Sequence, residues 1–561
     1  MLRRLFPFLL ASALLGADAH WIALRSGPFE VFSNVGEKPA REQLNQLEQF
    51  RETMRIITGK DDMRLVWPIR VIVTKSAPPD AKPFALGRDA RMAVVSESGF
   101  SRDALKDLAR LLLRDNTNKL PADVEQGIID LVSTVEIDAV RITLGAPVPE
   151  AERSTGWALM HLVTVSPEYA GRTRVMISNL EQTNDFDAAC HNAFEKSGAQ
   201  IREQVAAYLK AGNFPTTSLS GRALSAARDF KPVLLGSEDA RFALADLELA
   251  SGHTAEAATA YKALHGPAAS EGLAFVALRD QKDDDAAKAF QDAIESGSKN
   301  ARAYVELGTS KGDADLLKTG SALNPRWGEP YYQLADLDAA IDKPQLEQRA
   351  ALLKKACALN PRNMDYWTAL AKTYEAAKDF AEAQKAWSGA ERAAANDQER
   401  ERIAKVRLDV QAKRFDYEAA ERKRIHDEEA ADLARVKAKS DAEIHAAEVA
   451  ARKRMNPNGQ APPKPEAWYQ APPASGSSVD GVFQKLDCLS GAARMVIQTP
   501  DGKTVQLLMG DPSQISVGGG GAEQTLACGA QKNPRNVLVH YNPKPDTRLH
   551  TAGEVTTIEF H

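Results

Sequence analysis

A pattern of one small residue followed by two packing residues recurs four times between residues 255 and 390 and constrains the fold more than any other feature. The four copies are Ala257-Tyr261-Leu264, Ala286-Phe290-Ala293, Ala350-Leu353-Ala356 and Ala383-Trp387-Ala390. The residues of each copy share one helix face, because their spacings follow the helical period. An apolar helix precedes each copy, so the predicted unit is a helical hairpin that must stack on its neighbours to bury its apolar face.

Further positions in residues 238–397 follow the same unit. Asn324-Pro325 and Asn360-Pro361 end two units that lie 36 positions apart. The unit Asn363–Asp397 carries Trp367, Leu370, Ala371, Tyr374, Ala383, Trp387 and Ala390, and the unit from Asp239 carries Leu244, Ala245, Gly252, Ala257, Tyr261 and Leu264. This region resembles tetratricopeptide repeats, whose period is about 34 residues. The resemblance implies an α-solenoid of about five hairpins that binds a protein or peptide in its groove.

One unit departs from the repeat length. Asn300–Pro325 keeps Tyr304, Leu307 and Gly308 but is about nine residues shorter than the period. We therefore expect its second helix to be truncated.

The first 19 residues have the features of a secretory signal peptide. Arg3 and Arg4 precede an apolar run from Leu5 to Leu15, and Ala17-Asp18-Ala19 forms a small-residue cleavage site before His20. The alternative is a membrane anchor, but the run is shorter than the roughly 20 residues that span a bilayer. Because the rest of the sequence has no apolar run long enough to span a bilayer, the sequence predicts a periplasmic or secreted protein.

The composition favours no strongly charged partner. The chain holds 71 Lys and Arg against 76 Asp and Glu, a formal charge of −5 over 561 residues. This small net charge predicts no binding to nucleic acid. A chain of this length is too long for one hydrophobic core and predicts about three or four domains. Because most of the predicted segments are helical, the expected fold class is multidomain and mainly α.

Residues 20–213 alternate strand-like and helical segments. Phe29–Phe32, Ile69–Val73 and Ala90–Val95 are predicted strands, Ala40–Ile57 is a predicted helix, and helical spacing continues from Ser101 to about Leu209. These segments predict an α+β domain. Residues 214–237 are expected to connect it to the repeats.

Local stretches of this domain are similar to a known family. They are His20-Trp21 with Gly27–Phe32, then Leu47–Arg51, then Ser154–Leu159. Over about residues 20–212 the chain resembles the peptidase MA-like domain of gluzincin metalloproteases, which bacterial secreted proteins place before tetratricopeptide repeats. That family binds zinc through His-Glu-x-x-His on one helix and a Glu on the next helix.

The zinc ligands of that family are absent at the matching positions. The chain has Lys106, Asp107 and Arg110 in place of His-Glu-x-x-His, and Gln126 in place of the third ligand. Lys and Arg offer hydrogen-bond donors and no lone pair, so they cannot bind zinc. The alternative is that the alignment is accidental and the helix never held zinc. Both interpretations predict no metallopeptidase activity, no bound metal and no cofactor. His161 lies on a different predicted helix and is expected to be a core histidine.

The last third of the chain changes composition twice. Residues 398–454 are charged and free of Pro and Gly, which predicts a long helix on the order of 85 Å. Ile403, Val410 and Tyr417 keep a heptad spacing that then fades, which favours a solvated helix or a cap for the repeats over a coiled coil. Residues 455–478 are a Pro-rich linker, and residues 479–561 predict a small β domain with a turn at Asp501-Gly502.

Four cysteines complete the sequence-based predictions. Cys488 and Cys528 share the β domain and can form a disulfide outside the cytoplasm. Cys190 and Cys357 lie in apolar helical segments and are expected to be buried thiols.

Together these features predict a non-catalytic scaffold outside the cytoplasm that binds a protein or peptide partner of the bacterial envelope. Two alternatives remain. One is a secreted hydrolase or peptidase-related enzyme with a non-standard site, and the other is a structural protein whose β domain anchors it to the envelope.

Overall fold

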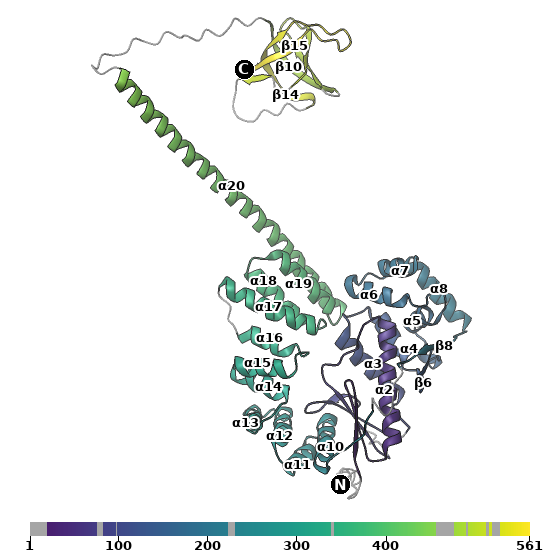
Figure 1. The fold of residues 1–561 in the computed structure, drawn as a ribbon. Coiled ribbons are helices and arrows are strands. Elements are labelled where there is room, and N and C mark those ends of the chain that lie inside the picture. Colours follow the sequence, from purple (N-terminus) through teal and green to yellow (C-terminus); the bar gives the residue numbers. More distant parts are fainter. Residues whose placement is uncertain are drawn as a thin grey trace, which may run out of the picture. The chain divides into compact units, whose positions relative to one another are not determined.

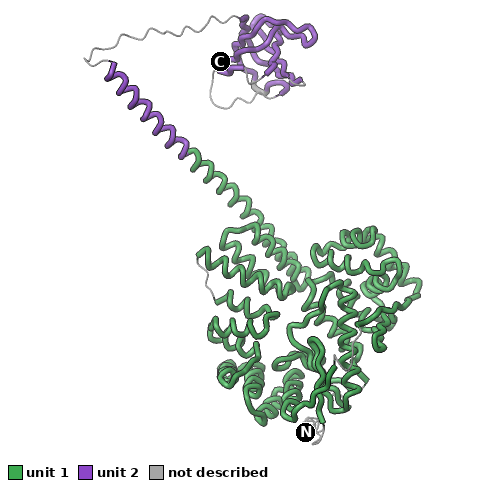
Figure 2. The backbone as a smooth tube through the Cα atoms, viewed as in Figure 1, with its two compact units in different colours: residues 1–430 green, residues 431–561 purple. Residues whose placement is uncertain are grey.

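The computed structural model describes residues 20–75, 82–96, 98–222, 230–337, 342–455, 476–489, 492–511, 515–518 and 528–561. The predicted signal peptide, residues 1–19, lies outside these ranges. The chain divides into two compact units, residues 1–430 and residues 431–561, which Figure 2 colours separately. Figure 1 shows that the first unit is built largely of helices and that the strands of residues 477–560 belong to the second.

A six-stranded mixed sheet forms the centre of the N-terminal part. Its strands are β1 (Ile22–Ser26), β2 (Phe29–Ser33), β3 (Ile69–Val73), β4 (Ala85–Leu86), β5 (Arg91–Val95) and β9 (Val233–Leu234), in the order β4-β5-β3-β2-β1-β9. β2, β3 and β5 run parallel, and the other neighbours pair antiparallel. Val71, Ile72 and Val73 of β3 are all fully buried, so both faces of the sheet are covered.

Helices of the N-terminal part share one hydrophobic core with one face of the sheet. They are α2 (Glu37–Thr58), α3 (Arg102–Asn116), α4 (Ala122–Val132), α5 (Thr155–Val165), α6 (Thr173–Thr183), α7 (Phe186–Phe194) and α8 (Gly198–Ala211), with the 3-10 turn η1 (Glu150–Glu152). Leu44, Leu47 and Met54 of α2 are spaced by three or seven residues and are fully buried against the sheet. α2 ends at Gly59, whose φ of 71° lies in the left-handed region that favours glycine.

The opposite face of the sheet packs on the first repeat helix, α10 (Ser237–Ser251). Trp21, Phe32, Ile72 and Met92 of the sheet lie in one core cluster with a row of α10 residues. The row consists of Ala240, Ala243, Leu247 and Ala250. The sheet therefore completes its core only with a helix that the sequence places in the repeats.

The predicted connection, residues 214–237, contains two strands. β8 (Thr217–Ser220) pairs with β7 (Arg141–Leu144), which itself pairs with β6 (Glu136–Asp138). β9 pairs with β1 at the edge of the main sheet. The sequence does not predict these strands, because two to four residues are too short to show a period and the partner strands lie far away in the sequence.

Five antiparallel helix pairs follow in the described part of residues 237–393. They are α10 with α11 (Thr254–Lys262), α12 (Pro267–Arg279) with α13 (Asp283–Glu295), α14 (Ala301–Lys311) with α15 (Ala314–Leu323), α16 (Glu329–Leu337) with α17 (Lys343–Leu359), and α18 (Met364–Ala376) with α19 (Phe380–Ala393). Each helix contacts the next along the chain, so the pairs stack in sequence order (Figure 1). The unit predicted to be short forms α14 and α15, and α15 has 10 residues.

The repeat-signature side chains lie in the helix interfaces. Those that are buried are Ala245, Ala257, Tyr261, Ala286, Phe290, Leu353, Ala356, Leu370, Tyr374, Ala383, Trp387 and Ala390, and Leu244 and Trp367 are partly buried. Two glycines make room for the largest of them. A Cβ atom on Gly272 would lie 2.4 Å from the Tyr261 ring, and one on Gly389 would lie 2.4 Å from the Trp367 ring. The aromatic residues of the signature therefore pack against helix backbone.

A single long helix, α20 (Asp397–Met455), follows the repeats. Its bounds agree within one residue with the predicted helix, residues 398–454. Ile403 and Val410 are buried in the core of the last repeats, so the first turns of α20 cap the solenoid. From residue 422 to residue 455 every side chain is exposed. None of the helices in the described ranges is both long and apolar enough to cross a bilayer.

The C-terminal unit contains a closed β structure. Its strands are β10 (Ser477–Leu489), β11 (Ala492–Gln498), β12 (Thr504–Met509), β13 (Ser516–Gly518), β14 (Gly529–Asn542) and β15 (Glu554–Phe560), in the order β12-β11-β10-β14-β15-β13. β12 also pairs with β15, which closes the sheet into a small barrel. The predicted turn at Asp501-Gly502 joins β11 to β12. Ser477 and Ser478, predicted as linker, already pair with Tyr541 and His540.

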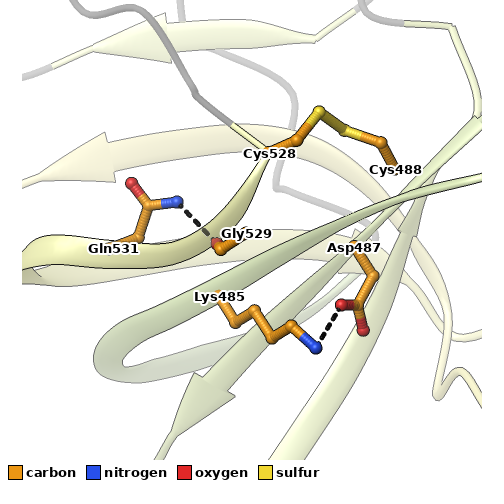
Figure 3. Close-up of a disulfide and its surroundings, with 6 residues drawn as sticks. All are labelled: Lys485, Asp487, Cys488, Cys528, Gly529 and Gln531. Atoms are coloured by element: carbon orange, nitrogen blue, oxygen red, sulfur yellow. Dashed lines mark hydrogen bonds and ion pairs between the residues drawn. A yellow bond between two sulfur atoms is a disulfide. The ribbon is translucent and has the colours of Figure 1, made fainter.

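A disulfide joins Cys488 of β10 to Cys528, which directly precedes β14 (Figure 3). The two Cα atoms are 5.7 Å apart. The other two cysteines, Cys190 and Cys357, are free and buried, and burial raises the pKa of each thiol to about 12. At neutral pH both are therefore protonated and unreactive.

The disulfide should contribute a measurable part of the stability of the C-terminal unit. It spans 40 residues of sequence, for which loop closure stabilises the fold by about 3–4 kcal/mol. We predict that Cys488→Ala with Cys528→Ala lowers the free energy of unfolding of this unit by that amount in urea titrations. Adding a thiol reductant should do the same to the parent protein and leave the double variant unchanged. A reductant effect of equal size on the double variant would contradict this assignment.

Candidate functional site

A buried network of ion pairs joins the N-terminal sheet to the first repeats. Arg88 lies in the turn between β4 and β5, and its side chain is 10% exposed. Its guanidinium donates to Asp246 of α10 (3.2 Å) and to Glu271 of α12 (2.5 Å). Arg70 of β3 donates to Asp246 as well (3.1 Å). Two arginines of the sheet are thus held by two carboxylates of the repeats.

The two carboxylates have further donors. Tyr261 donates its hydroxyl proton to Asp246 (2.6 Å), and Ser298 and Asn300 donate to Glu271 (2.6 and 3.0 Å). Burial raises the pKa of Asp246, which is fully buried. Burial opposes the charge on Arg88, but Asp246, Asp89 and Glu271 raise its pKa well above the usual value. The arginine therefore stays charged at any pH at which the protein folds.

A second row of contacts continues along the solenoid. Trp327 packs edge-on against Trp67 at 5.0 Å, and Asn324 donates to the Val66 carbonyl (3.0 Å). Arg362 donates to the Thr117 carbonyl (2.9 Å) and to the Glu125 carboxylate (2.8 Å). Further on, Lys119 donates to the Ala394 and Ala395 carbonyls. The loops after the second, third, fourth and fifth pairs therefore contact the N-terminal part, including the Asn-Pro loop at 324–325.

A cavity of about 700 Å³ lies at this junction. Its walls include Leu65, Val66, Trp67, Pro68, Arg88, Asp89, Glu271, Lys299, Asn300, Asn324 and Arg326. Arg88, Glu271 and Asn300 already satisfy one another across it. We therefore assign this cavity to the junction itself.

A second cavity, of about 530 Å³, lies between the last helix pair and the start of α20. It is lined by Thr368, Lys372 and Glu375 of α18, Trp387 of α19, and Arg402, Ile403 and Val406 of α20. We call this space the α18–α20 groove.

The electrostatics of the α18–α20 groove are positive. Glu375 accepts from Trp387 Nε1 (2.8 Å) and pairs with Lys413 (3.2 Å), so its charge is compensated. Lys372 and Arg402 are exposed, and within the described part of the chain neither takes part in an ion pair. The groove thus offers an apolar floor of Trp387, Ile403 and Val406 beside two free cations.

The positions that match the gluzincin ligands form ion pairs. Lys106 of α3 pairs with Glu152 (2.8 Å) and with Asp130 of α4 (3.4 Å), and Gln126 of α4 donates to the same Asp130 (3.0 Å). The structure therefore brings Lys106 and Gln126 together on facing helices. Asp107 and Arg110 pair with each other at 2.7 Å, each about half exposed, on the outer face of α3.

This cluster has the chemistry of an ion-pair network. Hydrogen bonds from Arg102 and then Lys106 lower the pKa of Glu152 to about 2, so the carboxylate is ionised at neutral pH. Among the described residues, no three His, Cys, Asp or Glu side chains are grouped to hold a metal ion. The predicted core histidine, His161, is fully buried, and its Nε2–H donates to the Gly145 carbonyl (2.9 Å). Tyr208 donates to His161 Nδ1 (3.0 Å), so the neutral imidazole is fully satisfied.

Several of the residues that define these sites are not singled out by sequence reasoning. Arg88, Glu271, Lys372 and Arg402 have no motif. Asp246 does leave a signal, because it lies three residues after Ala243 and four before Ala250, on the apolar face of a predicted helix. A carboxylate at such a position must be paired when buried.

Comparison with known proteins adds partial likenesses only. No protein-family model matches the chain, and no curated protein matches it. One similar solved structure is MamA, with 18% identity and a TM-score of 0.24 over 30% of this chain and 94% of that chain. Another is PilF of Pseudomonas aeruginosa, with 18% identity and a TM-score of 0.27 over 32% of this chain and 88% of that chain. A third is YrrB, described as a TPR protein with an unusual peptide-binding site, with 18% identity and a TM-score of 0.26 over 30% of this chain and 94% of that chain.

The fold of residues 237–393 is assigned from the chain itself. The five stacked helix pairs, with the repeat signature buried between them, make this a tetratricopeptide-type repeat region.

Arg88 should be the most sensitive residue of the junction. We predict that Arg88→Met costs about 3–5 kcal/mol of folding free energy, because Glu271 would stay buried without its cation and Asp246 would keep only Arg70. Urea denaturation of the full chain measures the change. Arg25→Met is the control, since the Arg25–Glu30 pair has a 68% exposed arginine and should change stability by less than about 1 kcal/mol. Equal losses in the two variants would refute the role given to the junction.

Proposed function

We propose that the protein is a non-catalytic scaffold outside the cytoplasm whose repeats bind a protein or peptide partner. The observation that carries the proposal is the α18–α20 groove. It combines an apolar floor with two cations, Lys372 and Arg402, that form no ion pair with any residue the structure describes. An apolar side chain of a peptide would bury the floor, and an adjacent carboxylate would pair with the cations.

The rest of the first unit supports a holding role. The loops between the repeats are already occupied by the N-terminal part, which leaves the uncovered helix faces for a partner. In this proposal the N-terminal part is a peptidase-like domain that serves as a base for the solenoid. Its Lys106 and Gln126 are engaged by Asp130 and Glu152, so they stabilise helix packing in place of a catalytic site.

Two features support the extracytoplasmic location. The first 19 residues have the signal-peptide pattern, and the β domain carries the Cys488–Cys528 disulfide. Structural disulfides persist in oxidising compartments and are rare in the cytosol.

The groove can be tested with a peptide display library screened against the full chain. We predict enrichment of short peptides in which an apolar residue is flanked by Asp or Glu. Lys372→Glu with Arg402→Glu should weaken the enriched peptides by about tenfold or more, because attraction becomes repulsion at two contacts. The matched control is Lys385→Glu with Lys405→Glu, which makes the same charge change on exposed residues outside the groove.

The outcomes of the peptide experiment are distinct. Equal binding by the groove variant and its control would reject the groove as the binding surface. Failure to enrich any peptide would reject peptide binding by this chain.

The absence of catalysis has its own test. We predict that purified protein incubated with zinc and then dialysed retains no stoichiometric metal, because Lys106 and Arg110 place cations at the ligand positions. Elemental analysis measures the metal. Bound zinc together with a peptidase activity that a chelator abolishes would overturn the proposal in favour of an enzyme.

A further inference from the structure

The distal part of α20 carries an apolar stripe that nothing in the described part of the chain covers. Leu433, Val436 and Ile444 are 71%, 65% and 55% exposed. The stripe consists of Leu433, Val436, Ser440, Ile444, Ala447 and Ala451, with spacings of three or four residues. At about 100° per residue these six side chains lie within an arc of about 80°. One face of residues 433–451 is therefore small or apolar.

The stripe follows an 11-residue repeat in place of the heptad sought in the sequence. Leu433, Ile444 and Met455 are 11 residues apart, and Val436 with Ala447 and Ser440 with Ala451 have the same separation. Eleven residues make three turns at about 3.67 residues per turn, close to the natural helix. The stripe therefore runs almost straight along α20, which suits pairing with another straight helix.

Large and small residues alternate along the stripe in a self-complementary way. Consider a second copy aligned antiparallel, with Ala442 of both copies at the centre. Leu433 then lies level with Ala451 of the second copy and Ile444 with its Ser440, and Val436 lies within one residue, about 1.5 Å along the axis, of its Ala447. Each large side chain thus faces a small one, which lets two helices approach closely. Parallel alignment would instead place Leu433 against Leu433 and Ala451 against Ala451.

The charges beside the stripe favour the same alignment. Lys437 lies within one residue of Glu448 of the second copy, and Asp432 lies within a turn of its Arg454. Each pair occurs twice in a two-fold dimer, which gives four attractive contacts. Glu443 lies close to Glu443 of the second copy and is the one like-charge contact at the centre. The attractive contacts between charges beside the stripe therefore outnumber the repulsive one.

We propose that residues 431–455 of α20 form an antiparallel helix pair with a second copy of this chain. The proposal does not depend on what the repeats bind, because the α18–α20 groove lies within residues 368–406.

Sedimentation equilibrium of the full chain tests the proposal. We expect the mass of a dimer, and Leu433→Lys or Ile444→Lys should give the mass of a monomer with unchanged helical circular dichroism. The matched control is Val449→Lys. Val449 is also an exposed apolar residue of α20, at 50%, but it lies on the side of the helix opposite the stripe and should leave the dimer intact. A monomeric parent protein, or a dimer that survives Ile444→Lys, would overturn the proposal.

Charge exchange tests the alignment. Lys437→Glu should weaken the dimer, and adding Glu448→Lys should restore it, because the exchanged pair has the same attraction. Glu443→Gln should tighten the dimer by removing the like-charge contact. Failure of the double variant to recover would reject the antiparallel register.

Cysteine cross-linking decides between the two directions. Leu433→Cys alone should not cross-link, since antiparallel copies separate the two sulfur positions by about 27 Å along the axis. Leu433→Cys combined with Ala451→Cys should cross-link upon oxidation. Cross-linking of the single variant would show a parallel pair and reject the proposed arrangement.

Discussion

The first unit depends on two arginines of the N-terminal sheet that are buried against carboxylates of the repeats. Arg88 reaches Asp246 and Glu271 at once, and Arg70 shares Asp246. An unpaired charge at this depth would cost several kcal/mol. The two sides of the junction therefore cannot separate without leaving their charged groups unpaired. The approach is close, because a Cβ atom on Gly87 would lie 3.0 Å from the Asp246 carbonyl oxygen. The junction is therefore specified by both charge and shape.

This constraint changes how the solenoid can work. A free tetratricopeptide array offers both its loops and its helix faces to partners. Here the loops after the third, fourth and fifth pairs contact Val66, Thr117 and Lys119 of the N-terminal part. The solenoid is thus held at several points along one edge and has little freedom to change curvature. The proposed partner would then meet a preformed surface, which reduces the ordering cost of binding.

Local periodicity predicted the helices and strands whose own residues show a clear apolar pattern. Residues 69–73 form β3 as expected, since a run of buried β-branched residues has few other solutions, and α20 begins and ends within one residue of the predicted helix. The repeat spacing predicted the stacked pairs. The expected truncation of the second helix at 300–325 does not set that unit apart, because α15 has 10 residues and α11 has 9. Periodicity could not predict β8 and β9, whose partners lie far away in the sequence, or the pairing of Lys106 with Asp130 and Glu152. Such contacts depend on which surfaces meet.

By itself the sequence determined the repeating helical hairpins, the long charged helix, the β-rich C-terminus and the absence of zinc-binding residue types at 106, 110 and 126. Each of these follows from residue types and spacings over a few turns or strands. Only the tertiary structure decided that α10 is both the first repeat helix and a layer of the N-terminal sheet, and that Lys372 and Arg402 face one groove. The reason is physical: an apolar or charged face shows what must be covered or paired, but the partner is chosen by the packing of segments distant in the chain.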